Sequence, residues 1–402
     1  MTRFTRRPGP TRPLLTTLFG AALAVSMVGV TTSCGSAETG SAGPVPQPPS
    51  LTPSSSQTPS PPTSQPAPTS AAGPCDALIS GLSPRQRLAQ LVVVGVEGDD
   101  AELPVELARS EQVGGIFIGG NATALFQGEA IERVQAASRV PLSIAVDDEG
   151  GRVQRIDELA GDIPSARTMA KTMSTEQVRD VARTRGAELA NRGVTVDYAP
   201  VTDVSDQPDD SVIGDRSFSD DPQVVRDYAL AFAEGLRESG VAPVLKHFPG
   251  HGAANGDSHR SLVTTPPLSE LSGHDLVPYR EIGDFPGVSV MVGHLDVPEL
   301  TDGEPASLSE PVYRLLRGEF GFAGPVITDD LGAMRAIKDR YSLPEAALKA
   351  LQAGADQALW SSGGRVGEVL DRLEAAQVSG ELPPERVQES LVRVLSGKNL
   401  CG

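Results

Sequence analysis

Residues 241–247 read VAPVLKH, an apolar run that ends in Lys246 and His247. The next segment, residues 248–259 (FPGHGAANGDSH), is rich in glycine and contributes His251, Asp257 and His259. An apolar run of this length, followed by turn-forming residues, is typical of a buried strand. We therefore expect a rigid strand that ends in polar side chains and a mobile loop that carries more of them.

Seven further apolar runs resemble this strand and alternate with helix-like segments. They cover residues 91–96, 113–120, 141–147, 194–204, 288–294, 325–329 and 355–360. Ser83 followed by Pro84 predicts the start of a helix before the first run. Eight strands alternating with helices predict an α/β fold, a single (β/α)8 TIM-like barrel over residues 75–402. The alternative, a doubly wound open sheet, lacks its Gly-x-Gly-x-x-Gly turn, because residues 97–100 (EGDD) follow the first run.

The first 74 residues have a different composition. Residues 1–33 combine four arginines, an apolar run interrupted by threonine and serine, and small residues, which predicts an export signal peptide. A retained anchor helix is the alternative. Residues 30–35 (VTTSCG) resemble a lipobox, so we expect Cys34 to be lipidated; ordinary cleavage and secretion is the competing interpretation. Residues 34–74 contain eleven prolines and a single charged residue, Glu38, which predicts a disordered tether.

The net charge of the chain restricts its partners. Without the four arginines of the signal, 30 basic and 52 acidic residues remain, a net charge of −22. Such a chain is not expected to bind nucleic acid or anionic lipid directly, so the membrane contact we expect is through the lipid anchor alone.

Cys75 and Cys401 bracket the folded region and predict a disulfide in an exported protein, with two unpaired thiols as the alternative. We expect a monomer without a cofactor.

Polar side chains recur where the predicted strands end. They are Asp147, Asp197, Asp203, Lys246, His247, His294 and Asp329. Because strand C-termini meet on one face of a barrel, these residues predict an active site there. An acidic site without a cofactor motif favours hydrolysis of a neutral polar substrate such as a sugar, with Asp329 as the candidate nucleophile or base.

The loop offers the second catalytic group. Asp257 lies two residues before His259 and can orient its imidazole, and a histidine paired in this way can protonate a leaving group and later deprotonate water. His247, His251 and His259 could also be metal ligands. Pro249 interrupts the helix that would place two of them on one face, and the first strand lacks a His-x-His pair, so we expect no metal.

Residues 246–252 (KHFPGHG) together with 257–259 (DSH) resemble the signature of the NagZ-type β-N-acetylglucosaminidases of glycoside hydrolase family 3. The resemblance extends to residues 147–155 (DDEGGRVQR), 212–218 (VIGDRSF) and 327–331 (ITDDL), and so to nearly all of residues 80–400. It implies a retaining exo-enzyme that removes terminal N-acetylglucosamine from muropeptides or cell-wall disaccharides through a glycosyl-aspartate. The implied roles are Asp329 as nucleophile, His259 as acid/base, Asp257 as its orienting partner, and sugar contacts from Asp147, Arg155, Arg216, Lys246 and His247.

The signal and tether resemble those of lipoprotein members of that family from actinobacteria, which implies an anchored enzyme on the outer face of the membrane, in the cell-wall zone. Asp148 stands where relatives commonly have glutamine, so we expect no sugar contact from it. We also expect no second domain of the kind that supplies a glutamate acid in family 3 β-glucosidases. Two other functions remain open: a phosphorylase that uses phosphate in the second step, and a non-catalytic wall-binding lipoprotein.

Three further side chains stand out in the sequence. Trp360 ends the last predicted strand, where it can stack on a sugar or fill the barrel rim. His294 is expected in the wall of the site, and His274 on the surface.

Overall fold

Eight parallel strands form the centre of the molecule. The computed structural model describes residues 75–96, 100–120, 124–254, 256–285 and 287–401, so the predicted signal peptide, Cys34 and tether lie outside the described residues. The strand order is β10-β1-β2-β3-β4-β5-β7-β9. The bounds are β1 Val92–Val96, β2 Gly115–Ile118, β3 Ser143–Val146, β4 Val196–Asp197, β5 Ala242–Phe248, β7 Ser289–Val292, β9 Val326–Thr328 and β10 Ala358–Trp360.

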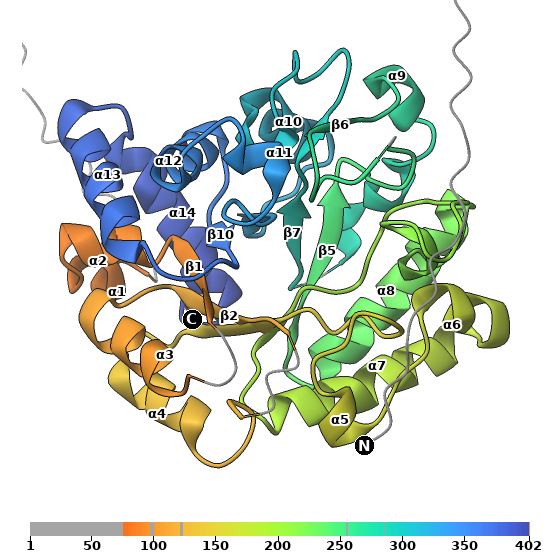
Figure 1. Cartoon of the computed structure of the whole chain (residues 1–402), viewed down its shortest axis with the longest axis horizontal. Coiled ribbons are helices and arrows are strands. Elements are labelled where there is room, and N and C mark those ends of the chain that lie inside the picture. The colour runs from red at the N-terminus through yellow and green to blue at the C-terminus, as the bar shows by residue number, and fades with distance from the viewer. Residues whose placement is uncertain (1–74, 97–99, 121–123, 255, 286, 402) are drawn as a thin grey trace, which may run out of the picture. The chain divides into compact units, whose positions relative to one another are not determined.

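The first and last strands of this order meet, which closes the sheet into a barrel. Ile327 and Gln357 form a parallel bridge, and the Thr328 N–H donates to the Gln357 carbonyl at 3.1 Å. Helices surround the strands on all sides (Figure 1). The predicted TIM-like barrel is therefore confirmed, and each of the eight apolar runs overlaps one strand, although β5 extends one residue beyond its run, to Phe248.

One strand is much shorter than its apolar run. Residues 194–204 were expected to form a strand throughout, but β4 covers Val196–Asp197 alone. Pro200 has no backbone N–H with which to continue the ladder. Beyond β4 the backbone still bonds to its neighbours, since the Tyr198 N–H donates to the Val146 carbonyl at 2.8 Å and the Ala199 carbonyl accepts from the Val244 N–H at 2.9 Å. Val201 then forms an isolated bridge with Lys246 of β5.

Side chains from all eight positions around the barrel fill its interior. The Phe117 and Tyr198 rings stack with centroids 5.5 Å apart. The full layer consists of Val93, Phe117, Ala145, Tyr198, Val244, Met291, Ile327 and Leu359. This apolar layer closes the barrel below the strand C-termini, so a substrate can enter from that face but cannot pass through.

Helices pack against the outside of the strands. As predicted, α2 starts after Ser83, whose hydroxyl accepts from the Gln86 N–H at 3.2 Å, and Pro84 is its first residue. The bounds are α1 Asp76–Ser80, α2 Pro84–Ala89, α3 Glu102–Glu106, α4 Ala130–Ala137, α5 Asp157–Ala160, α6 Ala166–Thr172, α7 Thr175–Ala190, α8 Pro222–Glu238, α9 Leu268–Leu271, α10 Glu310–Arg314, α11 Arg335–Lys338, α12 Leu343–Ala353, α13 Val366–Ser379 and α14 Pro384–Gly397. Short 3-10 or π turns cover Leu107–Glu111, Gly214–Arg216, Val277–Tyr279, Ile282–Asp284, Ala306–Leu308 and Leu315–Glu319.

A small two-stranded sheet completes the fold. β6 (Val263–Thr264) pairs in parallel with β8 (Leu295–Asp296) above the main barrel. Among the described residues, no helix is both long and apolar enough to cross a membrane.

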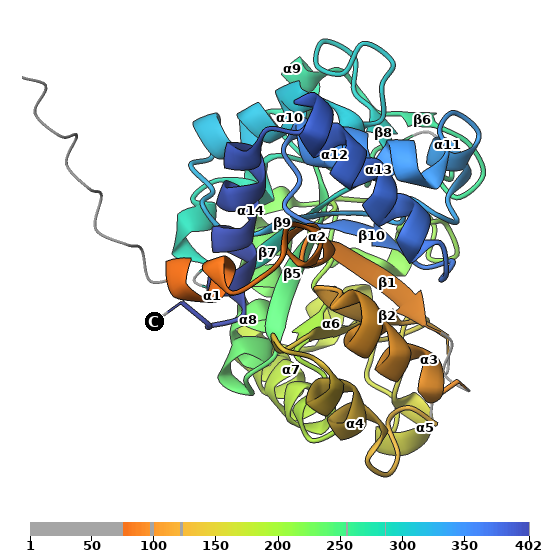
Figure 2. The same cartoon turned by 90° about the vertical axis from the view of Figure 1, so that its left-hand side faces the viewer.

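A disulfide links the two ends of the described region. Cys75 precedes α1 and Cys401 follows α14, and their Cα atoms are 4.9 Å apart. The two helices lie next to each other at the edge of the barrel (Figure 2). The structure thus contains the disulfide that the sequence predicts.

Replacing Cys75 and Cys401 together with serine should lower the free energy of unfolding by about 2–5 kcal/mol, because the bond closes a very long loop in the unfolded chain. Urea unfolding of the oxidised wild type and the double variant measures the difference. Wild type treated with a reductant is the control and should match the variant. Equal midpoints for all three samples would contradict a stabilising role.

Candidate active site

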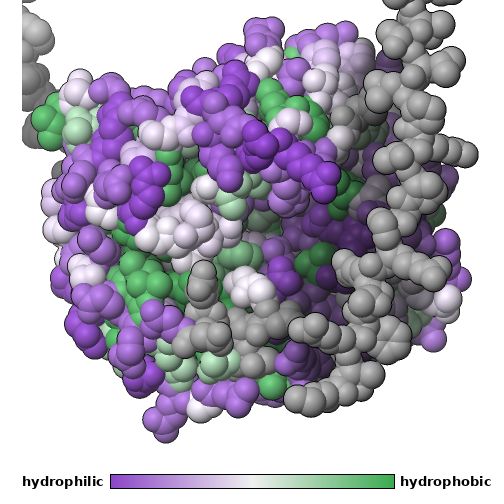
Figure 3. All heavy atoms as spheres, viewed as in Figure 1, coloured by the Kyte–Doolittle hydropathy of each residue, from purple (hydrophilic) through white to green (hydrophobic). Residues whose placement is uncertain are grey.

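A cavity of about 750 Å³ opens at the C-terminal ends of the strands. The face in Figure 3 is largely hydrophilic, with hydrophobic residues scattered among the polar ones. Seven of the eight predicted catalytic and sugar-binding residues line the cavity, and the eighth, Asp257, contacts one of them. The seven are Asp147, Arg155, Arg216, Lys246, His247, His259 and Asp329. The structure therefore brings the predicted site together.

Asp329 lies directly after β9 at the edge of this cavity. Its N–H donates to the Val292 carbonyl at 2.9 Å, and its Oδ1 accepts from the Asp330 N–H at 2.8 Å. Burial opposes ionisation, but the nearby His294 and His247 imidazoles and the Asp330 N–H outweigh it and lower the pKa of Asp329 to about 2. The carboxylate is therefore ionised at neutral pH, as a nucleophile must be.

His259 and Asp257 form a pair on the loop after β5. Oδ1 of Asp257 lies 2.8 Å from Nδ1 of His259 and also accepts the His259 N–H at 2.9 Å. Burial opposes ionisation of Asp257, but the hydrogen bonds from His259 prevail and lower its pKa. Because Nδ1 faces the carboxylate, Nε2 is the ring nitrogen that can exchange a proton with a substrate. The imidazole is 63% exposed at the cavity mouth, where a leaving group would lie.

The sugar-binding candidates form a chain of alternating charges. Lys246 Nζ lies 2.6 Å from Asp147 Oδ1 and 2.5 Å from Glu149 Oε1. Arg155 approaches the other Asp147 oxygen at 3.7 Å, and Arg216 donates to both Glu149 oxygens at 2.7 and 2.8 Å. Burial lowers the pKa of Lys246, but Asp147 and Glu149 raise it above its ordinary value. The site thus offers fixed, charged donors and acceptors to sugar hydroxyls.

The sequence did not single out Glu149 as a separate site residue. It is 5% exposed and lies between Lys246 and Arg216. Burial raises its pKa, but these two cations outweigh burial and lower it. Its place in the DDEGGR segment was a signal, but its partners are distant in sequence and become visible only in the fold.

Glu149→Gln should reduce kcat/KM by roughly 10–100-fold, mainly through KM, because Lys246 and Arg216 each lose a charge-assisted hydrogen bond. Steady-state kinetics on an aryl β-N-acetylglucosaminide measures this change. Glu188→Gln is the control, since Glu188 pairs with Arg192 on the outer surface of α7. Equal kinetics for both variants would show that Glu149 does not organise the site.

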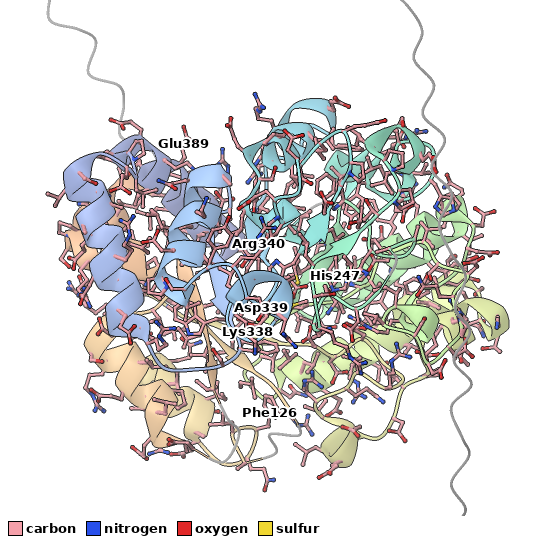
Figure 4. The ribbon with its side chains drawn as sticks, turned by 45° about the horizontal axis from the view of Figure 1, so that its top comes forward. Phe126, His247, Lys338, Asp339, Arg340 and Glu389 are labelled. Atoms are coloured by element: carbon pink, nitrogen blue, oxygen red, sulfur yellow. A yellow bond between two sulfur atoms is a disulfide. The ribbon has the colours of Figure 1, made fainter. Side chains whose placement is uncertain are left out.

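Asp203 is a second residue whose role the sequence did not assign. It is fully buried, and its Oδ2 lies 2.7 Å from Nδ1 of His247. Burial opposes its ionisation, but His247 outweighs burial and lowers the pKa of Asp203. A carboxylate at Nδ1 keeps the proton there and leaves Nε2 of His247 for the cavity. His247 lies inside the ring of strands and helices (Figure 4).

Two residues singled out in the sequence, Asp148 and Trp360, are buried and do not line the cavity. Asp148 is buried against Arg185, with 3.0 Å between Oδ1 and Nε, which agrees with the expectation that it makes no sugar contact. Trp360 is fully buried on the outer face of β10, in the core between the barrel and its helices. The idea that it stacks on a sugar is therefore wrong. Its neighbour Leu359 faces the cavity instead, because successive strand residues point to opposite faces.

The remaining histidines have separate partners. His294 is fully buried between the Ser307 hydroxyl and the Asp330 carbonyl. It does not line the cavity, so the expectation that it lies in the wall of the site is wrong. His274 is half exposed beside Asp275, in agreement with the predicted surface position. Within the described part of the chain, no three histidine, cysteine or acidic side chains are grouped to hold a metal ion.

A barrel with a candidate carboxylate nucleophile and a candidate acid/base pair on one face has the groups that a glycoside hydrolase needs. Residues 84–396 match the family model described as the glycosyl hydrolase family 3 N terminal domain. The chain belongs to this family and is a glycoside hydrolase.

Among its relatives is the β-hexosaminidase LpqI of Mycobacterium tuberculosis, 53% identical over 79% of this chain and 83% of LpqI. A β-hexosaminidase of Idiomarina loihiensis is 37% identical over 66% of this chain and 78% of its own length. The solved structure of M. tuberculosis LpqI superposes with a TM-score of 0.78 at 52% identity, covering 82% of this chain and 97% of LpqI.

Proposed function

We propose that the protein is a retaining exo-β-N-acetylglucosaminidase that removes terminal N-acetylglucosamine from muropeptides or cell-wall disaccharides. Its relatives are named β-hexosaminidases, and a structural neighbour of 33% identity from Paenibacillus is described as a β-N-acetylglucosaminidase. The observation that carries the proposal is the presence of ionised Asp329 and the Asp257–His259 pair at one cavity.

In the first step, an Asp329 oxygen attacks the anomeric carbon, and the bond from that carbon to the leaving-group oxygen breaks. The leaving oxygen takes the proton from Nε2 of His259. Asp257, which accepts from Nδ1–H, fixes the orientation of the imidazole and leaves Nε2 for the proton transfer. The products are the free aglycone and a glycosyl ester on Asp329.

In the second step, the neutral His259 removes a proton from water, and the water oxygen attacks the anomeric carbon. The ester bond breaks, which regenerates the Asp329 carboxylate and the protonated histidine. Two displacements at the same carbon retain its β-configuration.

The shape of the cavity favours removal of a terminal sugar. The layer of interior side chains closes the barrel beneath it, so a polysaccharide cannot pass through. Asp147, Lys246 and His247 lie on the strand ends, where they can bind the hydroxyls of one sugar. A chain end can enter the cavity, while the aglycone remains at the mouth near His259.

Product analysis on a purified muropeptide that ends in N-acetylglucosamine tests this function. Proton NMR during the first minutes should show the β-anomer of free N-acetylglucosamine, with the same product when phosphate is added. The α-anomer as first product would contradict retention. N-acetylglucosamine 1-phosphate would identify a phosphorylase, and binding without turnover would identify a wall-binding protein.

We further propose that Cys34 is lipidated and holds the enzyme on the outer face of the cell membrane, with residues 35–74 as a tether. The support is the lipobox-like VTTSCG segment and the proline-rich composition. Cys34→Ala should move the protein from the membrane fraction to the medium, as shown by immunoblotting of fractions. Cys401→Ser serves as a control for loss of a cysteine, and an unchanged distribution of the Cys34 variant would contradict the anchor.

A further inference from the structure

We propose that a buried hydrogen bond between His251 and Ser258 positions His259 for proton transfer. The inference rests on the proposed acid/base role of His259, because it concerns how that residue is held. His251 and Ser258 do not line the cavity, so they are positioning residues and not catalytic ones.

The bond joins the base of the loop to its tip. Nε2 of His251 lies 3.0 Å from Oγ of Ser258, and the two residues are 3% and 1% exposed. Ser258 stands between Asp257 and His259, so its side chain points into the protein while theirs form the acid/base pair. A buried polar pair of this kind is costly to break, because each partner would lose a hydrogen bond that offsets its burial.

The base of the loop is itself held firmly. The His251 N–H donates to Oδ1 of Asp203 at 2.7 Å, and the other oxygen of Asp203 holds His247. At Gly252, a Cβ atom would lie 1.8 Å from the Val204 carbonyl oxygen, so the backbone must pass there without a side chain. Asp203 thus connects a sugar-binding residue to the base of the acid/base loop.

The tip also rests on the segment that follows the nucleophile. The N–H groups of Arg335 and Ala336 donate to the carbonyls of His259 and Ser258, both at 3.3 Å. These N–H groups belong to the first turn of α11, where a helix has no acceptors of its own. The tip is therefore held by the side chain of His251 and by the first N–H groups of α11. This helix begins six residues after Asp329.

Loss of the His251–Ser258 bond should let the tip move while the cavity and nucleophile stay in place. Proton transfer is sensitive to displacements of about 1 Å, which can reduce rates by 10²-fold. Glycosides with poor leaving groups need that proton in the first step, whereas highly activated aryl glycosides do not. The predicted effect is therefore selective for the leaving group.

The test compares Ser258→Ala, His251→Phe and the double variant, all as full-length protein. For each, kcat/KM is measured on an N-acetylglucosaminyl disaccharide and on the 2,4-dinitrophenyl β-N-acetylglucosaminide. Melting temperatures report on the fold. Ser390→Ala is the matched control, because it removes a buried hydroxyl that bonds to Asp356 at 3.0 Å in another part of the barrel.

Each single variant should lose roughly 10–100-fold on the disaccharide and less than about 3-fold on the dinitrophenyl substrate. The double variant should lose no more than either single variant, because both remove the same bond. Equal losses on the two substrates, or additive losses in the double variant, would overturn the proposal. So would a leaving-group effect of the same size in Ser390→Ala.

The proposed function is tested separately in the same assay. If His259→Ala itself shows no dependence on the leaving group, the acid/base assignment fails. If His259→Ala shows the dependence and Ser258→Ala does not, the assignment stands and only the positioning role is wrong.

Discussion

Asp329→Asn should reduce kcat/KM on every β-N-acetylglucosaminide by on the order of 10⁴-fold or more, because the reaction loses its nucleophile. Asparagine has nearly the same shape and still accepts the Asp330 N–H, so the site should stay folded. The pKa of Asp329 is lowered to about 2, so in the wild type the missing charge is present throughout the neutral and mildly acidic range. Steady-state kinetics with both poor and activated leaving groups measures the loss.

The control for this variant is Asp180→Asn, which makes the same chemical change in an exposed pair with Arg183 on α7. It should retain full activity. If Asp329→Asn kept more than about a tenth of the wild-type rate, a difference of less than 1.4 kcal/mol in activation free energy, Asp329 would not be the nucleophile.

His259→Ala should reduce kcat/KM on the disaccharide by about 10²–10⁴-fold, the usual contribution of a general acid. The loss should be far smaller on the dinitrophenyl substrate, whose leaving group needs no proton. On that substrate the second step should become rate-limiting, because no base activates water. Added azide, which needs no base, should then speed turnover and give a glycosyl azide.

His274→Ala is the matched control, because the half-exposed His274 also lies beside an aspartate, with Nδ1 3.0 Å from Oδ2 of the buried Asp275, and does not line the cavity. It should leave both substrates unaffected. Equal losses on the two substrates for His259→Ala, without azide rescue, would assign His259 a binding role and leave the acid unidentified.

The barrel was predictable because each buried strand leaves a continuous apolar run in the sequence. The change from apolar to polar residues located Lys246 and His247 near the end of β5 and Asp329 directly after β9, although β5 continues one residue further, to Phe248. The extent of β4 was not predictable by this rule, because apolar residues such as Val201 and Val204 continue after the regular strand ends at Asp197. The side of β10 on which Trp360 lies depends on strand register, which the apolar run alone does not reveal.

The same contrast applies to the site. The Asp257–His259 pair is local in sequence, so its spacing indicated the hydrogen bond that the structure contains. Asp203 is 44 residues from His247, and Glu149 is 67 residues from Arg216. Only the closure of the barrel brings such partners together, so their roles became visible in the structure and not before.

The most direct test of the mechanism is to identify the residue that carries the sugar. His259→Ala mixed with the dinitrophenyl substrate should accumulate the glycosyl-enzyme, because its second step is slow. After acid quenching and digestion, peptide mass spectrometry should find one N-acetylhexosaminyl group on Asp329. A sugar on another residue, or free oxazoline product with no labelled peptide, would contradict the mechanism.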